Sequence, residues 1–247
     1  MDLGIDGRTA LITGASAGLG LACAQALAAE GVRVALSSRS AEKLAAAADT
    51  IPDGAITIPA DISDVDERRI MMGRAESELG RIDIVIANGG GPPAGNFATT
   101  DFEAYTDAVD LNLLPAIDLC KRFVPPMQER GWGRVVAITS TSVREPIDRL
   151  ILSNTARAGL TAFLKTTARE VAGDGVTVNS VQPGLHLTDR LKSVYEDPDV
   201  LAETVPARAL GDPADFGRIV AFLCSGHARF LTGQAIAVDG GATRSLQ

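Results

Sequence analysis

The stretch that decides the fold is TGASAGLG, residues 13–20, which follows the apolar run TALIT (9–13) and leads into the helical pattern LACAQALAAEG (21–31). Its three glycines have the spacing G-x-x-x-G-x-G, at Gly14, Gly18 and Gly20. Glycine allows a tight turn, close approach of the backbone to a ligand, and close packing of the helix on the strand. The start of the helix then offers N–H groups and the positive end of its dipole to a phosphate. A merely tight turn is the alternative, but the strand–turn–helix context favours dinucleotide binding.

Outward from this turn, short apolar runs alternate with longer Ala- and Leu-rich stretches. The runs predict strands at 9–13, 32–37, 55–60, 83–88, 133–139, 175–181 and 234–239. The longer stretches predict helices at 18–30, 41–50, 64–79, 101–122, 153–172 and 213–225. Strict alternation, with strands apolar throughout, indicates a parallel sheet covered by helices on both faces. Since no linker or repeat divides residues 1–247, we expect a single doubly wound α/β domain with about seven strands.

One segment departs from the alternation. Residues 184–206, GLHLTDRLKSVYEDPDVLAETVP, are strongly polar and contain Pro198 and Pro206. An insertion of this length between elements of a compact domain is usually a lid or a binding loop. We therefore expect these residues to form a substrate loop.

Composition points to a globular protein that acts on small molecules. Of the 247 residues, 46% are hydrophobic and 22% are charged, and the formal net charge is −8. This acidic balance argues against nucleic acid or an anionic membrane as the main partner. Neither a signal-peptide core nor 18 uninterrupted apolar residues occur. The three cysteines are widely separated, at Cys23, Cys120 and Cys224, which predicts buried reduced thiols, no metal site and a cytoplasmic location.

Further motifs follow the glycine turn along the chain. They are Asp61 in ADISD (60–64), Asn88 in NGGG (88–91), Asn112 in LNLL (111–114), Ser140 at the end of ITS (138–140), PGLHLT (183–188) and AVDGG (237–241). Together with TGASAGLG they resemble the motifs of the short-chain dehydrogenase/reductase family, with glycine in place of alanine in its N-A-G segment. The resemblance covers essentially the whole chain and extends to 3-oxoacyl-acyl-carrier-protein reductases. It implies a Rossmann fold that binds a nicotinamide dinucleotide.

The resemblance also implies which residues contact the cofactor. In the glycine turn these are Gly14, Ser16, Gly18, Leu19 and Gly20. Beyond the turn they are Ser38, Arg39, Asp61, Ile62, Asn88, Gly89, Arg157, Pro183, Gly184 and Thr188. In this pattern Asp61 lies beside the adenine, and the 183–188 segment lies beside the nicotinamide.

The end of the second strand bears on which nicotinamide cofactor is used. An acidic residue there would bind the ribose 2′-hydroxyl of NAD, but the chain has SSRS at 37–40. Ser38 leaves room for a 2′-phosphate, and Arg39 can pair with it through charge-assisted hydrogen bonds, unless Arg39 is only a solvated loop charge. Ala17 stands where many NADP-binding relatives carry a further basic residue. We expect NADP(H) to be preferred over NAD(H).

Two of the four expected catalytic positions carry the residues that are usual in this family, and two do not. The resemblance implies that Asn112 holds a relay water and that Ser140 hydrogen-bonds the substrate oxygen. The family's catalytic tyrosine, 13 residues after that serine, corresponds to Ser153, and its lysine corresponds to Arg157. An alcohol lies far outside the pKa range of a general acid at neutral pH, and an arginine stays protonated. Cofactor binding should therefore survive these replacements better than proton transfer does.

Few other side chains can supply a proton. Tyr105 is expected to pack in its helix, and His227 to lie in a surface turn. His186 falls in the segment beside the nicotinamide, where we expect a structural or substrate-contacting role, with general acid chemistry as the alternative. Tyr195 lies in the substrate loop and is a second candidate for substrate contact. Basic residues around the expected site mouth, Arg144, Arg149 and Arg190, raise the alternative of an anionic or carrier-linked substrate.

These features predict an NADP(H)-dependent oxidoreductase that interconverts a carbonyl and a secondary alcohol, acting on a small molecule with Asn112, Ser140, Ser153 and Arg157 at its catalytic site. The alternative is a catalytically inactive or non-redox nucleotide-binding relative, used as a sensor or a partner subunit. The resemblance implies a homotetramer formed through the helices at 101–122 and 153–172 and the C-terminal end.

Overall fold

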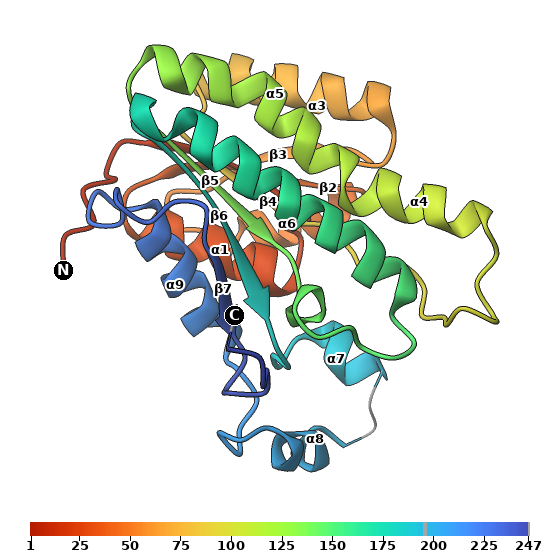
Figure 1. The fold of residues 1–247 in the computed structure, drawn as a ribbon. Coiled ribbons are helices and arrows are strands. Elements are labelled where there is room, and N and C mark those ends of the chain that lie inside the picture. Colours follow the sequence, from red (N-terminus) through yellow and green to blue (C-terminus); the bar gives the residue numbers. More distant parts are fainter. Residues whose placement is uncertain (195–196, 247) are drawn as a thin grey trace.

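The computed structural model describes residues 1–194 and 197–246, and within them a seven-stranded parallel sheet (Figure 1). The strands are β1 (Thr9–Thr13), β2 (Arg33–Ser38), β3 (Ile56–Pro59), β4 (Ile84–Ala87), β5 (Gly133–Ile138), β6 (Val176–Pro183) and β7 (Ala235–Val238). Their order in the sheet is β3-β2-β1-β4-β5-β6-β7. The doubly wound α/β fold is therefore confirmed. Because the chain winds outward from β1 in both directions, the crevice between the carboxyl ends of β1 and β4 is where such sheets bind ligands.

Helices cover both faces of the sheet. They are α1 (Gly18–Ala29), α2 (Ala41–Ala48), α3 (Val65–Leu79), α4 (Glu103–Asn112), α5 (Leu114–Glu129), α6 (Ile151–Val171), α7 (Asp189–Val194), α8 (Pro198–Thr204) and α9 (Pro213–Cys224). In Figure 1, α3, α5 and α6 lie on one side of the strands, and α1 and α9 lie on the other.

Two hydrophobic cores hold these layers together, because alternate strand residues point to opposite faces. In β1, Leu11 packs into the core under α3, α5 and α6, while Ile12 packs into the core under α1, α2 and α9. Both residues have no exposed surface. Cys23, Cys120 and Cys224 are buried and unpaired, as predicted. None of the helices in the described part of the chain is long and apolar enough to cross a membrane.

The helices that carry the catalytic positions differ from the sequence prediction in two places. The stretch expected as one helix at 101–122 is two helices, α4 and α5, which meet at Leu113. Pro115, which has no backbone N–H and whose ring clashes with a preceding carbonyl, stands at the start of α5 and explains the break. Helix α6 begins at Ile151 with Leu150 as its N-cap, two residues before the predicted start at Ser153.

The insertion at 184–206 carries two short helices, α7 and α8, beyond the carboxyl end of β6 (Figure 1). A bridge between His186 and Gly211 fastens its start to the segment that precedes α9. Tyr195 lies outside the described residues, as does the side chain of Arg190.

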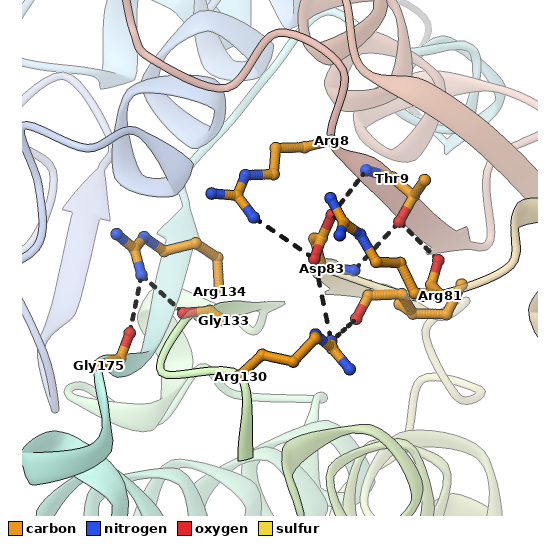
Figure 2. A network of polar contacts seen from close by, with 9 residues as sticks. Arg8, Thr9, Arg81, Asp83, Arg130, Gly133, Arg134 and Gly175 are labelled. Atoms are coloured by element: carbon orange, nitrogen blue, oxygen red, sulfur yellow. Dashed lines mark hydrogen bonds and ion pairs between the residues drawn. The ribbon is translucent and has the colours of Figure 1, made fainter. Parts of the chain in front are cut away.

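At the opposite, amino edge of the sheet, a buried carboxylate joins several arginines (Figure 2). Asp83, which is 1% exposed, accepts a hydrogen bond from Arg81 at 3.0 Å and pairs with Arg8 at 3.7 Å and Arg130 at 3.9 Å. The backbone N–H of Thr9 also donates to the Asp83 carboxylate. This network fastens the first residues of β1 to the segment that leads into β4, far from the carboxyl edge.

Candidate functional site

The glycine turn at 13–20 forms the floor of the site. Gly14 and Gly18 both have φ of +58°, a conformation that other residues rarely adopt. A Cβ on Gly20 would lie 2.4 Å from the carbonyl oxygen of Gly14, so helix α1 can approach the turn this closely only with glycine there. Asn88 donates from its Nδ2 to the same carbonyl at 3.0 Å, and its backbone N–H and carbonyl both bond the hydroxyl of Thr13.

The start of α1 is open to a ligand. Its N-cap, Ala17, has an extended backbone and contributes no side-chain hydrogen bond to the first turn. The N–H groups and the positive dipole end of this helix are therefore available to a phosphate group.

A pocket of about 400 Å³ opens beside the glycine turn, at the carboxyl ends of β1, β2 and β4. It brings together predicted cofactor residues that lie far apart in the sequence, namely Gly14, Ser16, Ser38, Arg39, Asp61, Ile62 and Gly89. Sequence reasoning missed Lys43, which lines the same pocket one helical turn after the SSRS segment. The buried Ser38 hydroxyl oxygen has no hydrogen-bond partner among the described residues, as expected of a group that would form its hydrogen bond with a ligand. The glycine turn and the polar groups of this pocket fit a dinucleotide.

Asp61 is held as a carboxylate in this pocket. The hydroxyl and the backbone N–H of Ser63 donate to its Oδ1 at 2.6 and 2.9 Å. The hydroxyl bond from Ser63, with a further contribution from the Arg39 charge, lowers the pKa of Asp61 below its ordinary value. A carboxylate acceptor of fixed orientation therefore lines the pocket.

At the other end of the site, Asn112 and Ser140 are held by backbone groups. Asn112 is 7% exposed and donates from its Nδ2 to the carbonyl of Gly90 at 2.8 Å. Ser140 lies two residues after the end of β5 and accepts a hydrogen bond from the N–H of Ser142 at 3.1 Å. Its hydroxyl proton is thus directed away from that N–H and can be donated elsewhere.

Ser153 and Arg157 are bonded to each other one turn apart in α6. The Nη1 of Arg157 donates to the Oγ of Ser153 at 2.7 Å, and the two residues are 8% and 6% exposed. Arg157 also lines a narrow cavity with Asn88, Gly89 and Asn112, so its side chain lies at the carboxyl edge of β4.

The segment at 183–188 borders the site next to the glycine turn. Gly184 is required where it packs on β7, since a Cβ there would lie 2.7 Å from the Cα of Asp239. The methyl group of Thr188 lies 3.6 Å from the position that a Cβ on Gly18 would take, which places this segment over the glycine turn. Pro183 ends β6 immediately before it.

His186 is turned into the protein between Gly211 and α9. Its Nδ1 hydrogen-bonds the carbonyl of Gly184 at 3.2 Å, and its ring meets Phe216 edge-on. Burial lowers the pKa of this imidazole below 6.5, which favours the neutral ring. No sequence signal indicated Phe216 as its partner, because the two residues lie in different elements. Contact of His186 or Tyr195 with substrate stays a prediction.

The other polar candidates are placed as follows. Tyr105 packs against the cluster of Ala108, Leu152 and Ala156, which confirms its packing role. Arg144 donates to the side chain of Gln182 and to the carbonyl of Ala235, so it is directed toward β6 and β7.

The two loops beside the start of α6 are joined through backbone groups that the sequence did not reveal. The N–H of Gly95 donates to the carbonyl of Arg149 at 2.7 Å, and Arg149 has φ of +65°. Gly95 and Leu150 also form an isolated parallel bridge. This junction holds the loop after β4 against the first turn of α6, beside Ser153.

The fold and this carboxyl-edge site define a doubly wound α/β protein that binds a dinucleotide. A family model described as Enoyl-(Acyl carrier protein) reductase matches residues 14–243. Acetoacetyl-CoA reductase of Cupriavidus necator is 32% identical over 239 residues, which are 95% of this chain and 97% of that protein. The chain belongs to the short-chain dehydrogenase/reductase family and is similar to 3-oxoacyl-acyl-carrier-protein reductases.

Solved structures of relatives agree with this assignment. L-sorbose reductase of Gluconobacter frateurii, in complex with NADPH and L-sorbose, is 29% identical with a TM-score of 0.93, and the match covers 100% of both chains. A 7α-hydroxysteroid dehydrogenase in complex with NADH is 30% identical with a TM-score of 0.91, covering 100% of this chain and 98% of that one. Family membership supports a carbonyl/alcohol oxidoreductase that uses a nicotinamide cofactor.

Proposed function

We propose that this chain is an NADP(H)-dependent oxidoreductase that interconverts a small carbonyl compound and a secondary alcohol, in a site where Ser153 and Arg157 take the places of the family's tyrosine and lysine. The observation that carries the proposal is the pocket beside the glycine turn, which brings Ser38, Arg39 and Asp61 to one place. A nicotinamide dinucleotide whose adenosine end binds in this pocket would supply or accept the hydride at its nicotinamide end.

The preference for NADP(H) rests on the charges at the end of β2. The segment presents Ser38 and Arg39 and no carboxylate where a 2′-hydroxyl would need an acceptor. Lys43 adds a second cation to the same pocket, and Ser40 holds the start of α2 by accepting from its N–H at 3.2 Å. Two cations and a hydroxyl suit a 2′-phosphate, because charge-assisted hydrogen bonds are the strong ones.

The remaining site residues have separate roles. Ser140 donates its hydroxyl proton to the substrate oxygen, and Asn112 holds the loop after β4 through Gly90 and orders a relay water. Arg157 anchors the ribose hydroxyls, and Ser153 contacts the substrate. Thr188, over the glycine turn, and Pro183 and Gly184 shape the space beside the nicotinamide.

A second candidate function is supported by the Ser153–Arg157 bond itself. A serine and an arginine that bind each other offer no general acid in the neutral pH range. A protein with this site would bind the cofactor without turning over ketones, as a sensor or as a non-catalytic subunit.

The assembly and setting that we propose follow the family. A homotetramer would use α4, α5 and α6 and the C-terminal end, where β7 is a half-exposed edge strand and Phe230 is 99% exposed. The name of the Cupriavidus necator relative supports a carrier-linked substrate. Three buried, unpaired cysteines support a reducing, cytoplasmic setting.

Binding of NADPH and NADH to the same sample, followed by fluorescence quenching, tests the cofactor. Arg39→Gln is expected to weaken NADPH about 10- to 100-fold, since a charge-assisted bond is lost, and to leave NADH nearly unchanged. Arg69→Gln, an exposed arginine on α3, is the matched control. Equal affinity of the unmodified protein for both cofactors would contradict the preference. Tight NADPH binding without oxidation over a broad ketone panel would favour the non-catalytic candidate.

A further inference from the structure

We infer that a cavity between α6 and the last two strands of the sheet is a binding site for a small organic dianion, separate from the cofactor pocket. The cavity has a volume of about 660 Å³, and it is lined by residues of α6, β6 and β7 and by the segment that follows Ser140. It shares no lining residue with the pocket beside the glycine turn. The inference therefore does not depend on the proposed function.

The charged groups around this cavity are positive, although the formal net charge of the chain is −8. Arg144 and Lys165 line it, and no acidic residue does so in the described part of the chain. Neither cation is paired with the carboxylate of a described residue. Asp239 lies within electrostatic range of Arg144, but its carboxylate accepts hydrogen bonds from Gly241 and Thr243 and does not line the cavity. Two such cations favour an anionic ligand.

The backbone at the start of β7 holds the two cations close together. The Nζ of Lys165 donates to the carbonyl of Gly233 at 2.9 Å, and the Nη2 of Arg144 donates to the carbonyl of Ala235. Gly233 and Ala235 are two residues apart, and two residues of chain span at most about 7 Å. The cations are thus anchored at neighbouring points, from which both can reach one small molecule that carries two negative charges.

Gln182 adds a buried hydrogen-bond donor to the same cavity. Its side chain is 0% exposed, and its Oε1 accepts from the Nε of Arg144 at 2.5 Å. Because the guanidinium has only donors, the amide must direct its oxygen toward Arg144 and its NH2 group elsewhere. The Nε2 of Gln182 has no hydrogen-bond partner among the described residues. A buried donor without a partner costs free energy, which an acceptor oxygen of a ligand would remove.

The lining of the cavity also narrows the class of ligand. Val143, Leu164 and Ala235 contribute apolar groups beside the three donors, so the cavity suits a short carbon skeleton better than a bare inorganic ion. Short dicarboxylates and phosphate esters of small alcohols share the required chemistry, namely two negative charges on such a skeleton. Hydrogen bonds from the two cations to these anionic oxygens would be charge-assisted.

Isothermal titration calorimetry with glutarate and with glycerol 3-phosphate, at physiological ionic strength and without any nicotinamide cofactor, tests the site. We expect at least one of them to bind with a Kd below about 1 mM, and the one that binds identifies the source of the charge. Butyrate, a monoanion, and glutaramide, a neutral compound, should bind at least tenfold more weakly. Lys165→Met should weaken the dianion at least tenfold, because a charge-assisted bond is lost. Arg169→Met, an exposed arginine on the same helix, is the matched control.

Gln182→Glu tests the buried donor while it keeps a partner for Arg144. The new carboxylate still accepts from the guanidinium, but it replaces the NH2 group with a negatively charged oxygen. We expect dianion binding to be lost, with a Tm no lower than that of the parent. Should this variant fail to fold, Lys165→Met still tests the site, because Lys165 is exposed and its substitution leaves the core intact.

Four outcomes would overturn the inference. Two are the absence of binding by both dianions and undiminished binding in Gln182→Glu. A third is loss of binding in Arg39→Gln combined with Lys43→Gln, because these cations line the cofactor pocket. The fourth is a changed oligomeric state of Lys165→Met in analytical ultracentrifugation without any dianion binding to the parent, since a second copy of the chain would then fill the cavity. Failure to bind NADPH would contradict the proposed function alone, because none of these titrations uses the cofactor.

Discussion

The imidazole of His186 stands edge-on to the ring of Phe216, with centroids 5.0 Å apart and an interplanar angle of 83°. This contact joins the segment beside the cofactor site to α9, on the far side of Gly211. Because Thr188 lies two residues further along and over the glycine turn, the same contact fixes the position of that threonine. A histidine in the nicotinamide segment thus serves packing in the described structure.

The buried ring of His186 predicts a pH-dependent loss of stability. Its pKa is lowered by burial, so below about pH 6.5 the unfolded chain binds a proton that the folded ring does not. The free energy of unfolding should therefore fall as the pH decreases from 6.5 toward the folded pKa, by at most about 1.4 kcal/mol per pH unit for one proton. Urea unfolding of the protein and of His186→Gln between pH 7 and 5.5 measures the difference in slope. His227→Gln is the matched control, since it leaves His186 in place.

Gly20→Ala is expected to damage the cofactor site more than the fold. The new Cβ would lie 2.4 Å from the carbonyl oxygen of Gly14 and 2.7 Å from the Asn88 Nδ2, so the turn must open. We expect NADPH affinity to fall at least tenfold, measured by fluorescence quenching, with the circular dichroism spectrum retained. Gly73→Ala in α3 meets nothing within 4 Å and should stabilise the protein by about 0.5–1 kcal/mol. Unchanged NADPH affinity in Gly20→Ala would contradict the assigned role of the turn.

Asp83→Asn tests the network at the amino edge (Figure 2). The amide keeps the size of the carboxylate but removes the charge that Arg8, Arg81 and Arg130 share. We expect the free energy of unfolding to fall by about 1–3 kcal/mol, less than for a fully buried pair because these arginines are partly exposed. NADPH affinity should not change, since the cofactor pocket is at the other edge. Asp66→Asn, an exposed partner of Arg69, is the control, and equal effects of the two substitutions would count against a special role for Asp83.

The sequence predicted the fold because its local signals agree with one another. Runs such as TALIT and GRVVAIT are β-branched, uninterrupted by charge in their centres, and separated by helical stretches, which leaves a parallel sheet as the consistent solution. The glycine turn at 13–20 then identified β1, because a dinucleotide-binding turn of this kind follows the first strand and uses the positive φ of Gly14 and the close packing at Gly20. The strand order explains why one pocket contains Ser38, Arg39 and Asp61, because it places the ends of the strands that precede them side by side.

What the sequence did not reveal depends on contacts between distant residues. The Asp83 network needs Arg8, Arg81 and Arg130, which come from three separate segments. The direction of His186 depends on Phe216, and no spacing rule connects the two. The break at Leu113 could have been predicted from the sequence, because Pro115 is unable to continue a helix that began before it. The apolar pattern continues on both sides of the break and favoured a single helix.

Ser153→Tyr combined with Arg157→Lys is expected to raise ketone reduction. The phenol brings an acid whose pKa lies near 10 and can be lowered by the adjacent ammonium, so an alkoxide can be protonated as it forms. The hydrogen bond from Arg157 to the Ser153 hydroxyl is removed at the same time. We expect kcat/KM for cyclohexanone to rise at least 100-fold, with NADPH affinity within threefold of the parent. Arg157→Lys alone should not raise ketone reduction, because no phenol accompanies it. A double variant that binds NADPH but gains no ketone reduction would show that the missing tyrosine and lysine do not limit this reaction.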